Sequence, residues 1–157
     1  MRQHHRIYAP TMWFNRYFLE LKSVYKSYYN NTYKQLLFFS AMEFVTLLSK
    51  GKGTWGQVSG LIKYGDWEKI ILIGDAFAKK FTAEKEFEFI EVDLDKKLLD
   101  LKDEFSKKLK GKIDGTEVAL SIASGDGKEH MALVSALLNL PVGIRFAALT
   151  KEGVIDL

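Results

Sequence analysis

The apolar residues along the chain fall into short continuous runs and longer stripes with a helical period. Apolar, β-branched runs bounded by turn residues are typical of buried strands. Phenylalanine alternates with glutamate over residues 86–92, which predicts a half-exposed or edge strand. Residues 151–153 predict a hairpin turn before a returning strand at Val154 and Ile155. The remaining predicted strands are residues 36–40, 69–74, 118–122 and 143–149.

Helical spacing appears between these strands. Residues 41–48 are expected to start a helix, whereas residues 58–64 contain Gly60 and form a poor one. A further helix begins near Lys128 and is stopped by Pro141. One leucine-rich stripe over residues 94–109 predicts the most secure helix, with Asp95 as a possible cap and Gly111 as a possible stop. On that helix the spacing favours two ion pairs, Asp103–Lys107 and Glu104–Lys108.

Strands that alternate with helices predict an α/β fold. We expect residues 36–157 to form a Rossmann-like three-layer sandwich with a mostly parallel sheet that ends in a short antiparallel hairpin. Residues 1–35 differ in composition and are expected to be a basic, aromatic, partly helical extension. Their only acidic residue is Glu20, and six basic residues accompany it: Arg2, Arg6, Arg16, Lys22, Lys26 and Lys34. Contact with nucleic acid, packing on the domain or a partner, and no role at all remain alternatives for this extension.

Composition narrows the classes of function. The chain has 157 residues, a formal net charge of +3, three histidines and no cysteine. One domain of this length buries a substantial core. The absence of cysteine excludes disulfides and thiolate metal sites and fits a cytoplasmic protein. Two of the histidines are adjacent near the N-terminus, so we expect no metal site. No apolar run is long enough to cross a membrane, and the N-terminus does not resemble a signal peptide.

The run from Ala123 to Lys128 contains the main candidate for ligand binding. It links a predicted strand to a predicted helix through Gly125, Asp126 and Gly127. Glycines allow a ligand to approach the backbone, and the free N–H groups at a helix start favour an anion. Lys128 adds a positive charge. We therefore interpret the loop as facing a phosphate or a nucleotide, although such a turn is also an ordinary strand-to-helix connection. It does not have the spacing of a P-loop.

A second glycine pattern precedes it. Gly51, Gly53 and Gly56 satisfy Gly-x-Gly-x-x-Gly, and Asp75 follows about 20 residues later, as in dinucleotide-binding proteins. The predicted helix at residues 41–48 separates this pattern from the preceding strand, so the sequence favours a flexible basic loop or a plain surface loop there.

Ligands of open α/β sheets bind beyond the carboxyl ends of the strands. Three candidates are expected to converge at that edge: Ser40, Asp75 and the run from Ser124 to Lys128. The helix after this run is apolar around nearly its whole circumference, so its outer face needs a cover. We predict a two-fold homodimer with this helix at or near the interface, and burial under residues 1–35 is the alternative.

The run from Ser124 to Met131, Ser-Gly-Asp-Gly-Lys-Glu-His-Met, resembles the loop after the fourth strand in the CRISPR-associated Rossmann fold (CARF) family. The resemblance covers residues 36–157 and includes a hydroxyl residue, Ser40, after the first predicted strand. It implies a homodimer that binds cyclic oligoadenylate, the second messenger of type III CRISPR immunity, across its two-fold axis. The chain ends at Leu157 without an effector domain, which leaves a stand-alone ring nuclease or a sensor that acts through another chain.

Ring cleavage requires in-line attack by the ligand's own 2′-hydroxyl and stabilisation of charge on the phosphoryl group. The candidate catalytic residues are Lys128 and Ser40, with no metal and no cofactor. The candidate ligand-binding residues are Ser124, Gly125, Asp126, Gly127, Asp75 and His130. A non-catalytic nucleotide-sensing or transcription-regulating module is the main alternative, and a dinucleotide-dependent oxidoreductase is a third.

Overall fold

The computed structural model describes residues 42–50 and 52–157. These residues form a six-stranded sheet in the order β3-β2-β1-β4-β5-β6. The first five strands are parallel, and β5 pairs with β6 in an antiparallel hairpin. The α/β Rossmann-like prediction is therefore confirmed. The strands are β1 (Met42–Leu48), β2 (Trp67–Gly74), β3 (Glu88–Glu91), β4 (Glu117–Ser121), β5 (Gly143–Thr150) and β6 (Gly153–Asp156).

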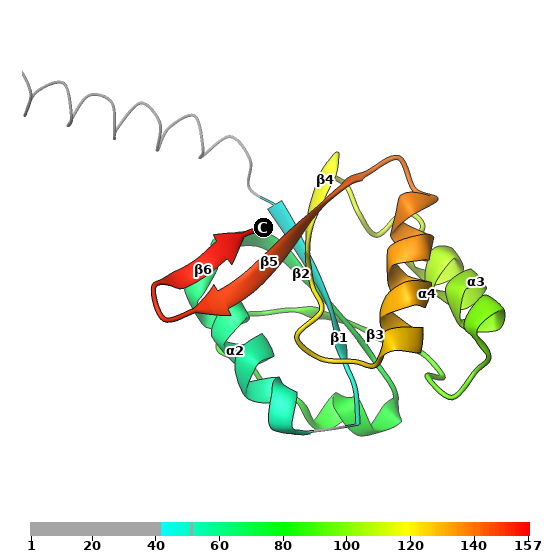
Figure 1. Ribbon diagram of the computed structural model, residues 1–157, viewed down its shortest axis with the longest axis horizontal. Helices are drawn as coiled ribbons and strands as arrows, with labels where there is room; N and C mark the ends of the chain where they lie inside the picture. The colour runs from blue at the N-terminus through cyan, green and yellow to red at the C-terminus, as the bar shows by residue number, and fades with distance from the viewer. Residues whose placement is uncertain (1–41, 51) are drawn as a thin grey trace, which may run out of the picture. The chain divides into compact units, whose positions relative to one another are not determined.

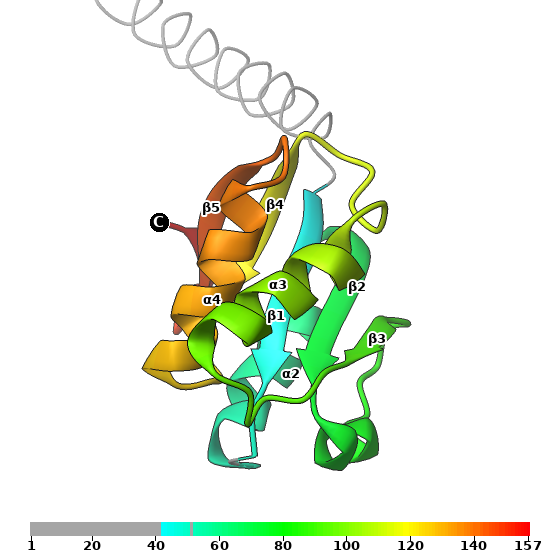
Figure 2. The same ribbon diagram turned by 90° about the vertical axis from the view of Figure 1, so that its right-hand side faces the viewer.

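Helices cover both faces of this sheet (Figures 1 and 2). α2 (Trp55–Tyr64) lies on one face, and α3 (Leu98–Leu109) and α4 (Gly127–Leu138) lie on the other. Two short 3-10 helices, η1 (Lys52–Thr54) and η2 (Ala76–Lys80), follow β1 and β2. This arrangement is the three-layer sandwich that the alternation of strands and helices predicted.

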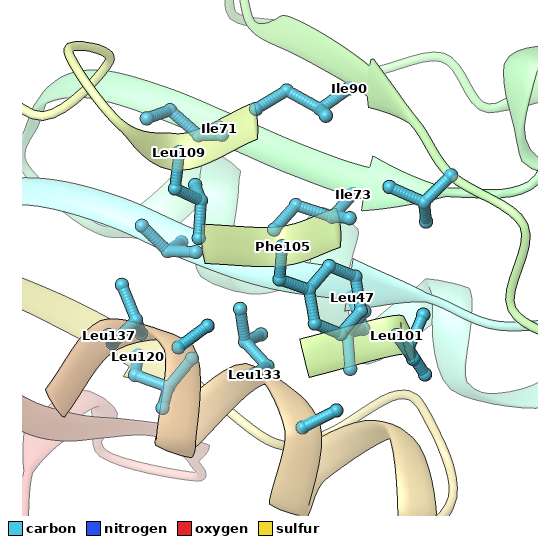
Figure 3. Close-up of a cluster of buried hydrophobic side chains, with 14 of the residues drawn as sticks. Leu47, Ile71, Ile73, Ile90, Leu101, Phe105, Leu109, Leu120, Leu133 and Leu137 are labelled. Atoms are coloured by element: carbon cyan, nitrogen blue, oxygen red, sulfur yellow. The ribbon is translucent and has the colours of Figure 1, made fainter. Parts of the chain in front are cut away.

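The core on the α3–α4 face is a cluster of buried apolar side chains from both helices and from the sheet. Figure 3 shows Leu101 and Phe105 of α3 and Leu133 and Leu137 of α4 gathered over β1 and its neighbours. Leu47 of β1 lies beneath them, fully buried. Burial of one such side chain contributes about 1.5–3 kcal/mol, so this cluster holds both helices to the sheet.

The first described strand corrects one prediction. Residues 42–48 form a buried strand, not the start of a helix, and every one of them is buried. Because β1 lies at the centre of the sheet between β2 and β4, both of its faces are covered, and its sequence shows a nearly continuous apolar run without alternation. The predicted strand at residues 36–40 and the predicted boundary after residue 35 lie outside the described residues.

The prediction that residues 58–64 form a poor helix is also wrong, because they belong to α2. Gly60 has a packing reason to be there. A Cβ at this position would lie 2.4 Å from Cδ2 of Leu149, so glycine lets the helix approach β5 closely. The edge-strand prediction for residues 86–92 is confirmed by β3, which ends the sheet on one side.

The leucine-rich helix begins later than expected. Leu98 starts α3, and Lys97, not Asp95, is its N-cap residue. The Asp95 carboxylate instead pairs with Lys50 at 2.7 Å. Glu104 and Lys108 form the ion pair that their spacing predicts, at 3.4 Å, whereas Asp103 pairs with Lys102.

Candidate functional site

The sheet changes its direction of winding between β1 and β4, which are neighbours although β2 and β3 intervene in the chain. In open parallel sheets such a switch point separates the loops that follow the two central strands and leaves a crevice where ligands bind. Here the two loops run from Ser49 to Thr54 and from Ile122 to Asp126. Both contain glycine, so the topology places the two candidate glycine patterns side by side.

Ser124 ties these two loops together. Its side chain is fully buried, and its Oγ accepts hydrogen bonds from the backbone N–H of Ser49 at 3.1 Å and from the Thr54 hydroxyl at 2.9 Å. The Trp55 indole reinforces the first loop by donating to the Ser49 carbonyl at 3.0 Å. Ser124, a predicted ligand-binding residue, therefore holds the walls of the crevice in place through its buried hydroxyl.

Gly125 and His130 brace the second loop from within. Nε2 of His130 lies 2.9 Å from the Ser124 carbonyl oxygen, so this nitrogen carries the proton and donates it. Gly125 has φ of +121°, and a Cβ there would lie 2.6 Å from the same Nε2. Glycine is required at this point both for the backbone conformation and for the close approach of the imidazole.

The N-terminus of α4 is closed by its own side chains. Asp126 accepts a hydrogen bond from the backbone N–H of Glu129 at 2.8 Å, and Glu129 accepts one from the backbone N–H of Asp126 at 2.9 Å. This capping box supplies a carboxylate at the position that an anion would otherwise take. Gly127 is the exposed first residue of the helix.

The N-terminus of α2 is different. Its N-cap residue, Thr54, makes no capping hydrogen bond with its side chain, and the first turn contains no acidic residue. A Cβ added to Gly53 or Gly56 would meet nothing within 4 Å, so their faces are open to an incoming group. An anion therefore meets no carboxylate at the start of α2, whereas Asp126 and Glu129 occupy the start of α4.

The sequence argued against a dinucleotide site at the Gly-x-Gly-x-x-Gly pattern because a helix was expected between the pattern and the preceding strand. In the part of the chain that the structure describes, no helix lies there. β1 ends at Leu48, directly before the glycine run, and α2 starts at Trp55 within it. This is the strand–loop–helix context that the pattern requires. The third glycine departs from the pattern, because Gly56 does not pack closely against the sheet.

Lys50 and Lys128, the lysines beside the two glycine patterns, are both held by the loop between β3 and α3. The Lys128 ammonium donates to the carbonyl oxygens of Leu94 at 2.7 Å and Lys96 at 3.0 Å. Lys50 pairs with Asp95, and this hydrogen bond is the main cause of the raised pKa of Lys50 and the lowered pKa of Asp95. Lys128 therefore fastens α4 to this loop instead of pointing into the crevice.

Asp75 lies at the carboxyl end of β2, as predicted, and caps the short helix that follows. Its Oδ1 accepts hydrogen bonds from the N–H groups of Phe77 and Ala78 and thereby caps η2. It also lines an acidic cavity of about 430 Å³ with Glu91, Asp93 and Glu104. Ser40 lies outside the described residues, and Ser49 is the residue that follows β1.

A second cavity, of about 410 Å³, lies on the α2 side of the crevice. Residues from the end of β4 and from the second half of β5 line it, together with Gln57 from the first turn of α2. The lining residues are Gln57, Ser121, Ile122, Ala123, Phe146, Ala147, Ala148, Leu149 and Leu157. The volume is within the range of small-molecule sites, about 300–1,000 Å³. Asp75 is not among its lining residues.

Sequence analysis missed Ser49, Thr54 and Gln57. These three residues lie in the segment that follows β1, so they would have been found if β1 had been predicted as a strand. The signal for this strand was an apolar run directly before a glycine-rich segment. Among the described residues, no group of three or more acidic or histidine side chains is arranged to hold a metal ion. Within the same ranges, no helix is both long and apolar enough to cross a bilayer.

The fold and the crevice define an α/β protein of the Rossmann-like class with a candidate ligand-binding edge at its β1–β4 switch point. Comparisons with protein-family models, with curated proteins and with solved structures find no match.

Proposed function

We propose that this protein binds a cyclic oligoadenylate at the carboxyl edge of its sheet, across a homodimer. The observation that carries the proposal is the hydrogen-bonded bridge through Ser124, which fixes two glycine-containing loops side by side at the switch point. A cyclic oligonucleotide presents several phosphates and several bases to a protein surface. The first turn of α2, which contains no acidic residue, suits the phosphates, and the largely apolar cavity lined by Gln57 of the same turn suits a base.

An exposed apolar face supports the dimer. Met131 and Leu138 lie one heptad apart on the same side of α4 and are 58% and 68% exposed. A second copy of this face would cover these side chains and bring two crevices together, which a ring-shaped ligand with two-fold symmetry requires.

Cleavage is the second step of the proposal. The 2′-oxygen of one adenosine attacks the adjacent phosphorus while the bond from phosphorus to the 5′-oxygen breaks. The 2′-hydroxyl proton leaves, the 5′-oxygen gains a proton, and the product ends in a 2′,3′-cyclic phosphate. Lys128 reaches a phosphate only after its ammonium leaves the Leu94 and Lys96 carbonyls. The geometry therefore favours binding more strongly than cleavage, in line with a sensor.

The test incubates the purified protein with cyclic tetra-adenylate and cyclic hexa-adenylate without metal and follows binding by calorimetry and products by mass spectrometry. Binding with linear products that end in 2′,3′-cyclic phosphate supports a ring nuclease. Binding without turnover supports a sensor. If neither ring binds at high micromolar concentration, the proposal is wrong.

A dinucleotide is the second candidate ligand, because the glycine pattern follows β1 directly and Asp75 lies at the end of β2. Asp75 is the residue that would bind a ribose hydroxyl. Its Oδ1 already caps η2, so the other carboxylate oxygen would have to make this contact. The same titrations with oxidised and reduced nicotinamide dinucleotides distinguish this candidate from the first.

A further inference from the structure

The cavity between β4 and β5 has one wall made of strand backbone. The ladder between β4 and β5 ends at the pair Leu120 and Phe146, whereas β5 continues to Thr150 and pairs there with β6 alone. No strand among residues 42–50 and 52–157 pairs with the other edge of this extension. The extension and the end of β4 both line the cavity, so the space opens where the two strands part.

The direction of the peptide groups along this wall follows from one hydrogen bond. The backbone N–H of Leu157 donates to the Phe146 carbonyl at 2.8 Å, so this carbonyl faces the β6 side. Peptide groups alternate in direction along a strand. The carbonyl of Ala147 and the N–H of Leu149 therefore face the opposite side, beyond the end of β4. They are a neighbouring acceptor and donor on an open strand edge, and the backbone groups of a buried residue such as Ala147 require a partner.

Most of the other side chains that line the cavity are apolar. Phe146, Ala148 and Ile122 supply hydrocarbon walls, and Ser121 and Gln57 are the two polar residues of the lining. A flat heteroaromatic ring with a donor and an acceptor on one edge matches both features of the cavity. Its faces bury against the apolar walls while its edge pairs with the strand.

We infer that this cavity is a purine site in which adenine pairs with the open edge of β5, its exocyclic N6 donating to the Ala147 carbonyl and its N1 accepting from the Leu149 N–H. Gln57 contacts the ring edge that carries N7. The inference rests on the proposed function for the identity of the base, and it assigns that base a place and a partner.

The site explains why the ligand would be an adenylate. Phosphates bound at the α2 N-terminus carry no information about the base, as in other nucleic-acid complexes. The donor–acceptor order of the β5 edge suits the Watson–Crick edge of adenine. It presents a carbonyl to the N6 amino group, which guanine replaces with an oxygen that cannot donate.

The test uses ligands altered one atom group at a time. Adenosine, N6,N6-dimethyladenosine and 1-deazaadenosine are titrated into ¹⁵N-labelled protein, and the amide resonances of residues 146–150 are followed. We expect adenosine to shift the Leu149 amide and each analogue to bind at least about fivefold more weakly, as the loss of a base-edge hydrogen bond predicts. Equal binding of the three ligands, or binding that leaves the Leu149 amide unmoved, overturns the inference.

Two variants locate the site independently. Ala148→Leu fills the cavity and should weaken adenosine binding, whereas Ala76→Leu, the same change in the acidic cavity, should leave it unchanged. Both folds are checked by the amide spectrum. If Ala148→Leu folds and binds adenosine as the wild type does, the site lies elsewhere and the inference fails.

A parallel titration with cyclic tetra-adenylate separates the inference from the proposed function. If the ring binds but the Leu149 amide does not move, the proposed function stands and the purine site is wrong. If adenosine binds at Leu149 but the ring does not bind, the purine site stands and the proposed function fails. If neither ligand binds, both are wrong.

Discussion

Ser124 accepts a hydrogen bond from the backbone N–H of Ser49 at 3.1 Å, and this contact joins two loops between which the chain forms every element from α2 to β4. The bond is placed at the switch point, where the sheet alone leaves the two loops unconnected. Because the Ser124 side chain is fully buried, the loops form one wall and are not independent flaps.

The first prediction concerns this bridge. Ser124→Ala removes the acceptor for the Ser49 N–H and the Thr54 hydroxyl, and an unpaired buried group costs about 1–3 kcal/mol. We expect a loss of that size in the free energy of unfolding, measured by urea denaturation, and weaker ligand binding. Ser135→Ala on α4 is the matched control. Equal stability of Ser124→Ala and the wild type would show that the bridge contributes nothing.

Gly125 provides the second prediction. Gly125→Ala places a side chain at φ of +121° and pushes a Cβ against the His130 imidazole, so it should lose about 1–3 kcal/mol. Gly127→Ala, two residues away, meets no atom within 4 Å and should be close to neutral. Thermal unfolding of both variants gives the comparison. Similar melting temperatures for the two would contradict the role assigned to the loop conformation.

Lys128 provides the third prediction, and its structural role changes how a mutant would be interpreted. Lys128→Ala removes two charge-assisted hydrogen bonds to the β3–α3 loop, each worth about 1.5–3 kcal/mol when fully formed. We expect faster hydrogen exchange over residues 93–98 in the variant, with Lys107→Ala on the exposed side of α3 as the control. An unchanged exchange pattern would mean that the ammonium is free to act on a ligand.

The sequence predicted most of the fold because its strands differ in composition from its helices. β2, β4 and β5 are apolar runs between turn residues, and β3 alternates as an edge strand does. β1 was predicted as a helix because Met42, Glu43 and Leu47 belong to residue types that also favour helices. Its strand character comes from burial between β2 and β4, a tertiary effect that local propensity does not contain.

That single error displaced the candidate site. With residues 41–48 predicted as the start of a helix, the Gly51–Gly56 pattern was separated from its strand. The predicted strand at residues 36–40, with Ser40, lies outside the described residues. The hydrogen bonds that Asp126, Lys128 and His130 make to backbone groups could not be predicted from the sequence, for another reason. Whether such side chains face a ligand or hydrogen-bond the chain's own backbone depends on contacts with Glu129, Leu94 and Ser124, which spacing does not determine.

The fourth prediction concerns the contribution of Glu104 to the free energy of unfolding at low pH. Burial raises the pKa of this carboxyl, but the Lys96 ammonium at 3.0 Å and Lys108 at 3.4 Å outweigh burial and hold the pKa below its usual value of 4.5. Lys96 approaches Oε2 outside hydrogen-bonding geometry, so we treat this contact as an ion pair. A lowered pKa in the folded state means that the folded state binds the proton more weakly than the unfolded state.

The contribution of Glu104 is therefore complete above the unfolded-state pKa and is lost as the pH falls through the folded-state pKa. Glu104→Gln should be less stable than the wild type at pH 7, by roughly 0.5–1 kcal/mol, and the difference should shrink below about pH 4. Urea denaturation across this pH range measures it. A difference that stays constant with pH would assign the loss to packing instead of charge.

The last prediction concerns the exposed face of α4. Leu138 and Leu99 are exposed to nearly the same extent, 68% and 70%, but Leu138 shares its face with Met131 whereas Leu99 lies on α3. If a second copy covers the α4 face, Leu138→Asp introduces two unpaired charges into the interface and should yield a monomer. Leu99→Asp should leave the dimer intact. Sedimentation velocity of the three proteins decides the matter, and a wild-type protein that sediments as a monomer at high micromolar concentration would refute the interface. The binding of a cyclic ligand would then have to occur on one chain, with a single crevice facing the ring.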